Sequence, residues 1–305
     1  MNDTASTTNQ ALLVTGASGQ LGRRVLDLLL ARGVGRIIAT TRKPESLAEY
    51  RARGVEVRRA SFADAPATLA AAFEGAQRAL LISTDDVTEQ RLPQQANAVK
   101  ALEAAGVAHV VYTSLPAADT STVLIAPHHA GTEKAIAETK LGYTFLRNNL
   151  YAEMLFLSLP GALASGQLVD ARGRGKTAFV TREDCARVAA AVLASGKTER
   201  AAHDVTGPEA LTSDEVVAIA SEVLEKPLAH LSVSKEARID GVVKHGLPRP
   251  LAELIASFDV SIARGELERV TDSVEKLTGK KPQSLREFML ASRAAFLAPP
   301  RSLAH

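Results

Sequence analysis

The stretch Leu12-Leu13-Val14-Thr15-Gly16-Ala17-Ser18-Gly19-Gln20-Leu21-Gly22 decides the fold. An apolar run typical of a β-strand leads directly into the glycines, and a helical pattern starts within the last residues of the stretch. Gly16 permits a tight turn, Gly19 lets a pyrophosphate approach the backbone, and Gly22 lets the helix pack close to the strand. The free N–H groups at the start of the helix can hold the anion. We therefore expect every residue from 16 to 22 to contact a dinucleotide; the alternative is a structural turn without a ligand.

Beyond this turn, the N-terminal half alternates between β-type runs and helical stretches. The predicted strands are Leu12–Thr15, Arg36–Thr40, Val55–Ala60, Ala79–Ser83, Val107–Ser114 and Tyr143–Arg147. The predicted helices between them are Leu21–Arg32, Pro66–Phe73, Pro93–Ala105 and Gly131–Lys140. Strands that alternate with helices of this length form βαβ units. The sequence therefore predicts an α/β fold with a Rossmann-type, doubly wound parallel sheet whose ligands lie at the carboxyl ends of the strands.

The pattern loosens after Arg147. Residues 148–164 read as an apolar loop or helix, 172–176 as a basic loop, 183–195 as a helix, and 203–208 as a strand ending in a turn. Thr212 or Ser213 caps a further helix, since acidic residues follow at once. We predict a disordered tail over residues 1–10 and an NAD(P)-binding domain over 11–158 that also uses about 184–208. Residues 159–183 and 209–305 are expected to form a smaller, mainly helical substrate-binding lobe.

Composition and charge narrow the class of protein. The 305 residues are 46% hydrophobic, and the formal net charge is +2, which is too small to favour nucleic acid or an anionic membrane as a partner. There is no apolar window long enough for a membrane span or a signal segment. The single cysteine, Cys185, excludes an internal disulfide and a cysteine metal cage. We expect a cytoplasmic protein without a metal site, acting as a monomer or homodimer, with Cys185 buried and inert.

The end of the second predicted strand bears on the choice of cofactor. An NAD enzyme usually places an acidic residue here, on the ribose 2′-hydroxyl. This chain instead reads Ala39-Thr40-Thr41-Arg42-Lys43-Pro44. The Arg42 guanidinium can fork onto a 2′-phosphate, and Lys43 adds positive charge. The sequence therefore favours NADP(H) over NAD(H); the alternative is a solvated basic loop.

Taken in order, several stretches resemble the NmrA-like branch of the atypical short-chain dehydrogenases/reductases. The resemblance is nearest to the NAD(P)H:quinone oxidoreductase and triphenylmethane reductase subgroup. Beyond the glycine turn, which the whole superfamily shares, the matching stretches are Leu80–Thr84, Tyr112–Leu115, His129 with Thr132–Lys134, Leu146–Asn149 with Tyr151 and Glu153, and Thr181–Asp184. These later stretches are much more specific, and the similarity runs from Leu12 to about Phe288.

The resemblance implies a set of cofactor contacts beyond the glycine turn. Arg42 is implied at the 2′-phosphate, and Phe62-Ala63 is implied over the adenine, although Ser61 replaces an aspartate that is frequent there. The other implied contacts are Ser83 and Thr84 after the fourth strand, Asn148, Asn149, Leu150 and Tyr151 near the nicotinamide, and Arg182. Lys134 matches the lysine position of the family.

Ordinary short-chain dehydrogenases protonate a carbonyl oxygen with the tyrosine of a Tyr-x-x-x-Lys pair. The four tyrosines of this chain are followed, four residues later, by Gly54, Pro116, Arg147 and Leu155, so the pair is absent. A quinone or a triarylmethyl cation accepts hydride without strong acid help, because the product anion is stabilised or the product is neutral. The missing pair therefore favours a conjugated acceptor that is simply positioned over the nicotinamide.

Three residues are candidates for the catalytic site. Lys134 would orient the ribose or nicotinamide or supply positive potential; alternatively it is a helix-surface lysine. Tyr151 would wall the acceptor site; alternatively it is a packing aromatic. His129 would donate a proton through water, whereas a metal site at His128-His129 is not expected, because no acidic or thiol partner lies at metal spacing.

Two classes of function follow from this reading. The first is an NADPH-dependent oxidoreductase that transfers hydride to a quinone or a similar conjugated acceptor, such as an azo or triarylmethane dye. The alternative is a non-catalytic NADP(H)-sensing regulatory protein of the NmrA type, which would bind the cofactor without turnover. A weaker third option is a reductase for a small aromatic metabolite.

Overall fold

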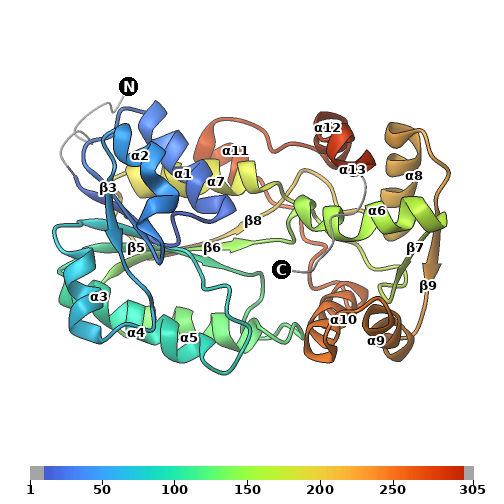
Figure 1. The fold of residues 1–305 in the computed structure, drawn as a ribbon, viewed down its shortest axis with the longest axis horizontal. Coiled ribbons are helices and arrows are strands. Elements are labelled where there is room, and N and C mark those ends of the chain that lie inside the picture. Colours follow the sequence, from blue (N-terminus) through green and yellow to red (C-terminus); the bar gives the residue numbers. More distant parts are fainter. Residues whose placement is uncertain (1–9, 299–305) are drawn as a thin grey trace.

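The computed structural model describes residues 10–298, and its centre is a seven-stranded sheet (Figure 1). The strand order is β3-β2-β1-β4-β5-β6-β8, and every neighbouring pair is parallel. The bounds are β1 Leu12–Val14, β2 Ile37–Thr41, β3 Glu56–Arg59, β4 Arg78–Leu81, β5 His109–Ser114, β6 Gly142–Asn148 and β8 Ala201–Val205. The strand order reverses between β1 and β4, which opens a crevice at their carboxyl ends. The predicted Rossmann-type fold is confirmed.

Helices cover both faces of this sheet (Figure 1). One face carries α1 Gln20–Ala31, η1 Pro44–Leu47, α2 Ala48–Ala52, α7 Arg182–Ala194 and α11 Ser273–Thr278. The other face carries α3 Pro66–Phe73, α4 Arg91–Ala104 and α5 Ala126–Ala137. Each layer has its own apolar core, because a parallel sheet must be buried on both faces. Helix α5 begins five residues before the expected Gly131, because Pro127 in its first turn starts the helix rather than breaking it.

The rest of the chain forms a lobe beside the carboxyl ends of the strands (Figure 1). Its helical elements are η2 Ala152–Met154, α6 Leu155–Ser165, α8 Ser213–Leu224, α9 Lys235–Lys244, α10 Arg249–Ala263, α12 Leu285–Ala291 and α13 Arg293–Leu297. Thr212 caps α8 in a reciprocal capping box with Glu215, which resolves the two predicted caps in favour of Thr212. The lobe also holds a two-stranded parallel sheet of β7 Gln167–Asp170 and β9 Ala229–Ser232 that the sequence analysis missed.

Two expectations concern the first ten residues of the chain and whether any of its segments spans a membrane. The predicted tail over residues 1–10 lies outside the described residues except for Gln10. Within residues 10–298, none of the helices combines the length and the apolar character that crossing a bilayer would require.

Arg78 illustrates how the amino-terminal edge of the large sheet is completed. Its side chain is fully buried at the start of β4, where burial lowers the pKa of the guanidinium to about 10, so that it stays charged at neutral pH. It donates from Nε to the Leu193 carbonyl at 2.8 Å, from Nη2 to the Val192 carbonyl at 3.0 Å, and from Nη1 to the Lys197 carbonyl. The carboxyl end of α7 and the residues after it thus supply a partner to each nitrogen of a buried cation, which suits the negative end of the helix dipole.

Candidate functional site

The glycine turn joins β1 to α1 with the geometry that the spacing predicts. Gly16 has a φ of +58°, in the left-handed region that favours glycine. A Cβ atom at Gly22 would lie 2.6 Å from the Gly16 carbonyl oxygen and 2.7 Å from the Ala17 Cα atom. A side chain at position 22 would therefore push α1 away from the turn.

The first turn of α1 is open to an anion. Helix α1 follows its N-cap Gly19 with no side-chain cap and no acidic residue in its first turn. Helices α3, α4, α5, α6 and α10 share these two properties, but only α1 follows the glycine turn. The first N–H groups of a helix lack partners within the helix. An anion at this position would accept those hydrogen bonds and face the positive end of the dipole. This arrangement fits a pyrophosphate.

The loop after β2 is tied to the glycine turn. Ser18 Oγ lies 2.8 Å from Thr41 Oγ1, and Arg23 Nε donates to the Ser18 carbonyl at 3.1 Å. Arg42 and Lys43 are both exposed, and Arg42 Nη2 lies 3.0 Å from the Asp85 carboxylate in the loop after β4. The two predicted cations therefore stand at the mouth of the crevice, with one of them already facing an acid.

The loops after β3 and β4 are also held in place by side chains. Asn97 Nδ2 on α4 donates to the carbonyls of Phe62 at 2.8 Å and Asp64 at 2.9 Å, a contact that no sequence pattern indicated. The Ser83 backbone N–H donates to Thr113 Oγ1 at 2.9 Å. Thr84 Oγ1 donates to Gln94 Oε1 at 3.3 Å. These bonds hold the predicted adenine and β4 contacts at the carboxyl edge of the sheet.

Two polar atoms at the ends of neighbouring strands lack hydrogen-bond partners. Ser114 Oγ at the end of β5 and Asn148 Oδ1 at the end of β6 are both buried without a partner in the described structure. An unsatisfied buried polar atom costs about 1–3 kcal/mol. Their position, on the same sheet edge as the open α1 terminus, indicates that a polar ligand or water completes them.

Tyr151 lies beside Asn148 and next to Arg182. Asn148 Nδ2 donates to Tyr151 Oη at 3.1 Å, and the Arg182 guanidinium stands 5.0 Å from the centre of the tyrosine ring. Burial is the main cause that raises the pKa of Tyr151, so the phenol keeps its proton. The Arg182 backbone N–H donates to the Glu153 carboxylate at 3.0 Å. The structure therefore brings Asn148, Tyr151 and Arg182 together.

Asn149 and Leu150 are engaged with the protein itself. Asn149 is buried, its Nδ2 donates to the Leu267 carbonyl at 3.1 Å, and its Oδ1 accepts from the Leu150 N–H at 2.7 Å. These contacts join the end of β6 to the lobe. The Asn149 side chain is thus bonded within the protein, whereas the neighbouring Asn148 Oδ1 has no partner.

The two candidates on α5 lie in different surroundings. Lys134 is exposed over 76% of its side chain, and its nearest charge is Glu138 at 3.8 Å. His129 is buried, with Nε2 at 3.1 Å from Arg91 Nη2 and Nδ1 at 2.9 Å from Tyr112 Oη.

The partners of His129 define its protonation. Burial, with Arg91 and His128 nearby, lowers the pKa of its ring to about 3. Because a guanidinium only donates, Nε2 must accept and Nδ1 must carry the hydrogen that goes to Tyr112. The ring is neutral and its nitrogens are occupied, which does not favour the predicted role as a proton donor.

Other polar groups contribute less to the site. Cys185 is buried and burial raises the pKa of its thiol well above the ordinary value, as expected of an inert cysteine. Among residues 10–298 no group of three or more His, Cys, Asp or Glu side chains is arranged to hold a metal ion.

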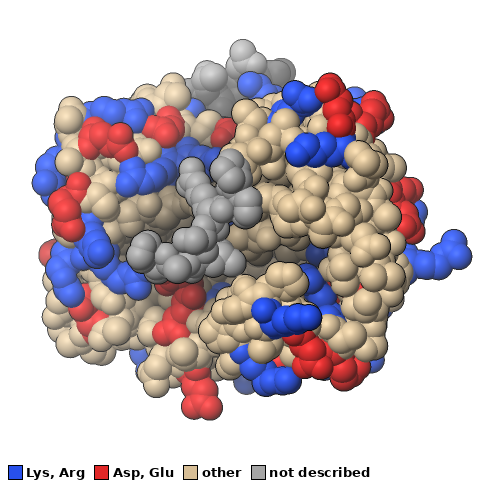
Figure 2. Space-filling model, turned by 45° about the vertical axis from the view of Figure 1, so that its right-hand side comes forward, with Lys and Arg blue, Asp and Glu red and all other residues tan. Residues whose placement is uncertain are grey.

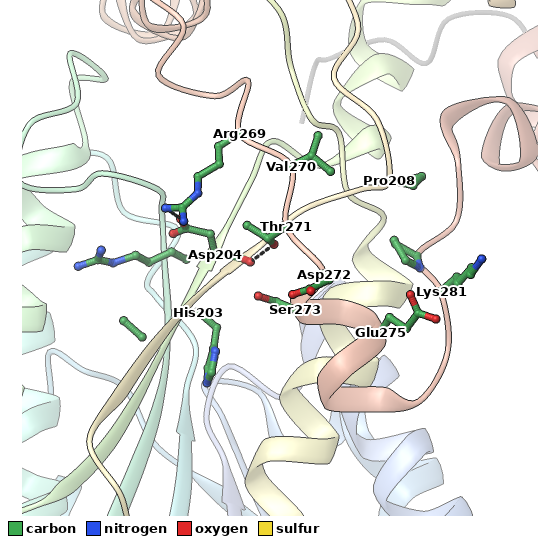
Figure 3. A pocket seen from close by; sticks show the side chains of 13 residues that line it. His203, Asp204, Pro208, Arg269, Val270, Thr271, Asp272, Ser273, Glu275 and Lys281 are labelled. Carbon is green, nitrogen blue, oxygen red and sulfur yellow. Dashed lines mark hydrogen bonds and ion pairs between the residues drawn. The ribbon is translucent and has the colours of Figure 1, made fainter.

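A groove of about 870 Å³ lies elsewhere, along β8 and the segment before α11 (Figure 3). Arg269 pairs with Asp204 there at 3.1 Å, and Thr271 Oγ1 donates to the Asp204 carbonyl at 2.6 Å. None of the residues predicted to bind the cofactor lines this groove. On the face in Figure 2, cationic and anionic side chains are interspersed, and uncharged residues cover a broad part of the lobe.

The family model for the NmrA-like family matches residues 8–289 of this chain. Quinone oxidoreductase 2 of Escherichia coli is 35% identical over 90% of this chain and 96% of its own length. Its structure in complex with NADPH covers 91% of this chain and 98% of that chain, with a TM-score of 0.87. The triphenylmethane reductase of Citrobacter sp. in complex with NADP(H) is 36% identical, covers 92% of this chain and 99% of its own, and has a TM-score of 0.86. An NAD(P)H azoreductase of Xenophilus azovorans is 27% identical over 93% of this chain and 99% of its own length.

Proposed function

This chain belongs to the NmrA-like family, and from that premise we propose that it is an NADPH-dependent oxidoreductase acting on a quinone or a similar conjugated acceptor. The similarity to reductases of quinones, azo dyes and triphenylmethane dyes supports this class of activity. The single observation that carries the proposal within the site is the unpartnered Asn148 Oδ1, on the same sheet edge as the uncapped α1. The regulatory alternative finds less support among these relatives.

The residues around the crevice fit NADP(H) as follows. The N–H groups at the start of α1 bind the pyrophosphate, and Arg42, with Lys43 nearby, binds the 2′-phosphate. The Phe62-Ala63 loop covers the adenine, while Ser83 and Thr84 contact the cofactor from the β4 loop. When bound, the cofactor supplies a hydride from its nicotinamide ring. Asn148 Oδ1 orients that ring by accepting a hydrogen bond.

The side chains that surround the acceptor hold it in place, and proton exchange with it is a minor part of their role. Tyr151 keeps its proton and accepts from Asn148, so its own hydrogen is free to point at an acceptor oxygen. Lys134 has only a weak surface ion pair to lose, and its charge orients the ribose or stabilises negative charge on the reduced acceptor. Tyr112 is unsuited to proton donation to an acceptor, because it is almost completely buried.

The remaining parts of the proposal concern partners and location. The acceptor is a small aromatic or conjugated molecule, and neither nucleic acid nor a membrane is a partner. The protein works in the cytoplasm, as a monomer or a homodimer, and needs no metal ion.

Turnover measurements test the proposed function. The purified protein is mixed with NADPH and a panel of quinones, azo dyes and triarylmethane dyes, and the loss of NADPH absorbance is followed. We expect turnover with at least one conjugated acceptor and none with a simple aliphatic ketone. Tight binding of NADPH without any turnover would instead support the regulatory alternative.

A further inference from the structure

An ion pair crosses the crevice at the point where the cofactor is expected to lie. Strand β1 stands between β2 and β4 in the sheet. Arg42 follows the end of β2 and Asp85 follows β4, so their contact at 3.0 Å spans the carboxyl end of β1. The glycine turn begins at that same end. The pair is therefore a strap over the entrance to the predicted pyrophosphate site.

In the loop after β4, hydrogen bonds to the residues on either side of Asp85 hold it in place, and its own carboxylate takes no part in them. Arg91, a buried cation, donates from Nη1 to the carbonyls of Thr84 and Asp86, the residues on either side of Asp85. The Asp86 carboxylate is itself engaged, by Thr88 and by Gln94 Nε2 at 2.8 Å. The Asp85 side chain is 76% exposed, and Arg42 is the partner that the described residues give it.

Arg42 is the cationic partner in this ion pair. Its side chain is 69% exposed, and the preceding residue, Thr41, contacts Ser18 of the glycine turn at 2.8 Å. A guanidinium binds a carboxylate or a phosphate through the same fork of N–H groups. The Asp85 carboxylate therefore occupies donors that a cofactor 2′-phosphate requires.

We propose that Asp85 reduces the preference for NADP(H) by competing with the 2′-phosphate for Arg42. The proposal rests on the proposed function, since it assumes that a dinucleotide binds at this crevice. When the phosphate takes the guanidinium, Asp85 loses its partner and stays as a like charge beside a dianion. NAD(H) carries no such phosphate and leaves the strap intact. Asp85 thus weakens NADP(H) binding, and speeds NADP⁺ release, without penalising NAD(H).

The size of the effect follows from the exposure of the pair. Exposed ion pairs contribute about 0.2–1 kcal/mol, and tenfold in affinity corresponds to about 1.4 kcal/mol. Asp85→Asn should therefore tighten NADPH binding by about 1.4- to fivefold. The dissociation constant of NADH should stay unchanged or rise. The effect should shrink at high salt, because both charges face solvent.

Calorimetric titration of the full chain with NADPH and with NADH tests this. The variants are Asp85→Asn, Arg42→Ala and the double variant. Glu89→Gln is the matched control, because it removes the same charge from the same loop and Glu89 is exposed. We expect Asp85→Asn to tighten NADPH alone, Glu89→Gln to change little, and Asp85→Asn to lose its effect when Arg42 is already Ala.

Three outcomes would overturn the proposal: equal effects of Asp85→Asn on NADPH and NADH, no effect on either, or the same gain in the Arg42→Ala background. Failure of the wild-type chain to bind either dinucleotide would instead contradict the proposed function. The two failures are therefore distinguishable in one set of titrations.

Discussion

The two edges of the large sheet present a contrast between a buried charge and buried neutral oxygens; His109 Nδ1, at the start of β5 on the amino-terminal edge, is a further buried atom without a partner. At the amino-terminal edge, the buried Arg78 guanidinium has a backbone carbonyl for each of its nitrogens, all supplied by the end of α7 and the residues after it. At the carboxyl edge, Ser114 Oγ and Asn148 Oδ1 are buried without partners, and α1 begins without a cap. Both edges belong to the same parallel sheet.

The difference indicates that the amino-terminal edge contributes to stability and that the carboxyl edge contributes to binding. A buried charge is tolerated only when the protein satisfies it completely, which is what the end of α7 does for Arg78. Leaving buried atoms unpartnered costs stability, and a site that must admit a ligand accepts that cost. The comparison therefore predicts that changes at the amino edge alter folding and that changes at the carboxyl edge alter cofactor binding.

Replacing Arg78 should have the largest effect. Arg78→Met leaves three carbonyls without this donor, two of them in buried hydrogen bonds, and we expect the free energy of unfolding to fall by about 3–5 kcal/mol in urea titrations. Arg78→Lys should lose less, because it keeps the charge and a donor. Arg53→Met is the control, since that arginine is exposed and should change stability by about 1 kcal/mol or less. A normal stability of Arg78→Met, or a weakened NADPH affinity in Arg78→Lys, would break the comparison.

Closing the glycine turn should come next. Gly22→Ala places a Cβ atom against the Gly16 carbonyl and displaces α1, so we expect the NADPH dissociation constant to rise by about 30- to 100-fold. Gly161→Ala in α6 is the matched control, because its Cβ atom would meet nothing within 4 Å. That control should bind NADPH normally and be slightly more stable. Unchanged NADPH binding by Gly22→Ala would remove the turn from the site.

His129 resembles Arg78, in that the protein occupies both of its nitrogens. Its pKa in the folded protein is about 3, below the ordinary value of the unfolded chain, so the unfolded state takes up a proton first as pH falls. The stabilisation is complete above pH ~6.5 and is lost progressively towards pH ~3, and the part already lost at pH 5 is roughly 2 kcal/mol. Unfolding curves of the wild type and His129→Gln at several pH values check this. An identical pH dependence in both proteins would contradict it.

Replacing Asn148 should have the smallest effect of these variants, and it should weaken NADPH binding with little change in stability. Asn148→Ala removes the unpartnered Oδ1, so we expect NADPH binding to weaken about tenfold while the unfolding free energy changes by less than about 1 kcal/mol. Binding and unfolding of the same sample are measured side by side. A large loss of stability with normal NADPH binding would assign Asn148 to the scaffold instead.

The features that the sequence predicts correctly are those encoded by patterns within short segments. The residues from Gly16 to Gly22, the alternation of strands and helices, and the cap at Thr212 each lie within a few consecutive residues. The small sheet of β7 and β9 escaped because both strands are short and three of the four β9 residues are exposed, so the apolar alternation that marks a strand is weak.

Contacts between distant segments could not be predicted in this way. Arg42 was selected for its charge, but its contact with Asp85 depends on β2 and β4 flanking β1. His129 was selected from a resemblance, whereas its neutral state depends on Arg91 and Tyr112 from two other elements. Strand order and helix packing create these partners, and no spacing within one segment encodes them.

The central claim is that the carboxyl edge of the sheet is left open for NADP(H). Calorimetric titration of the wild-type chain with NADPH and NADH under identical conditions tests it most directly. The open α1 terminus and the exposed Arg42 predict that both dinucleotides bind, with NADPH tighter by about tenfold, which corresponds to about 1.4 kcal/mol for the 2′-phosphate contact. Equal affinities for NADPH and NADH, or no binding of either, would contradict the account.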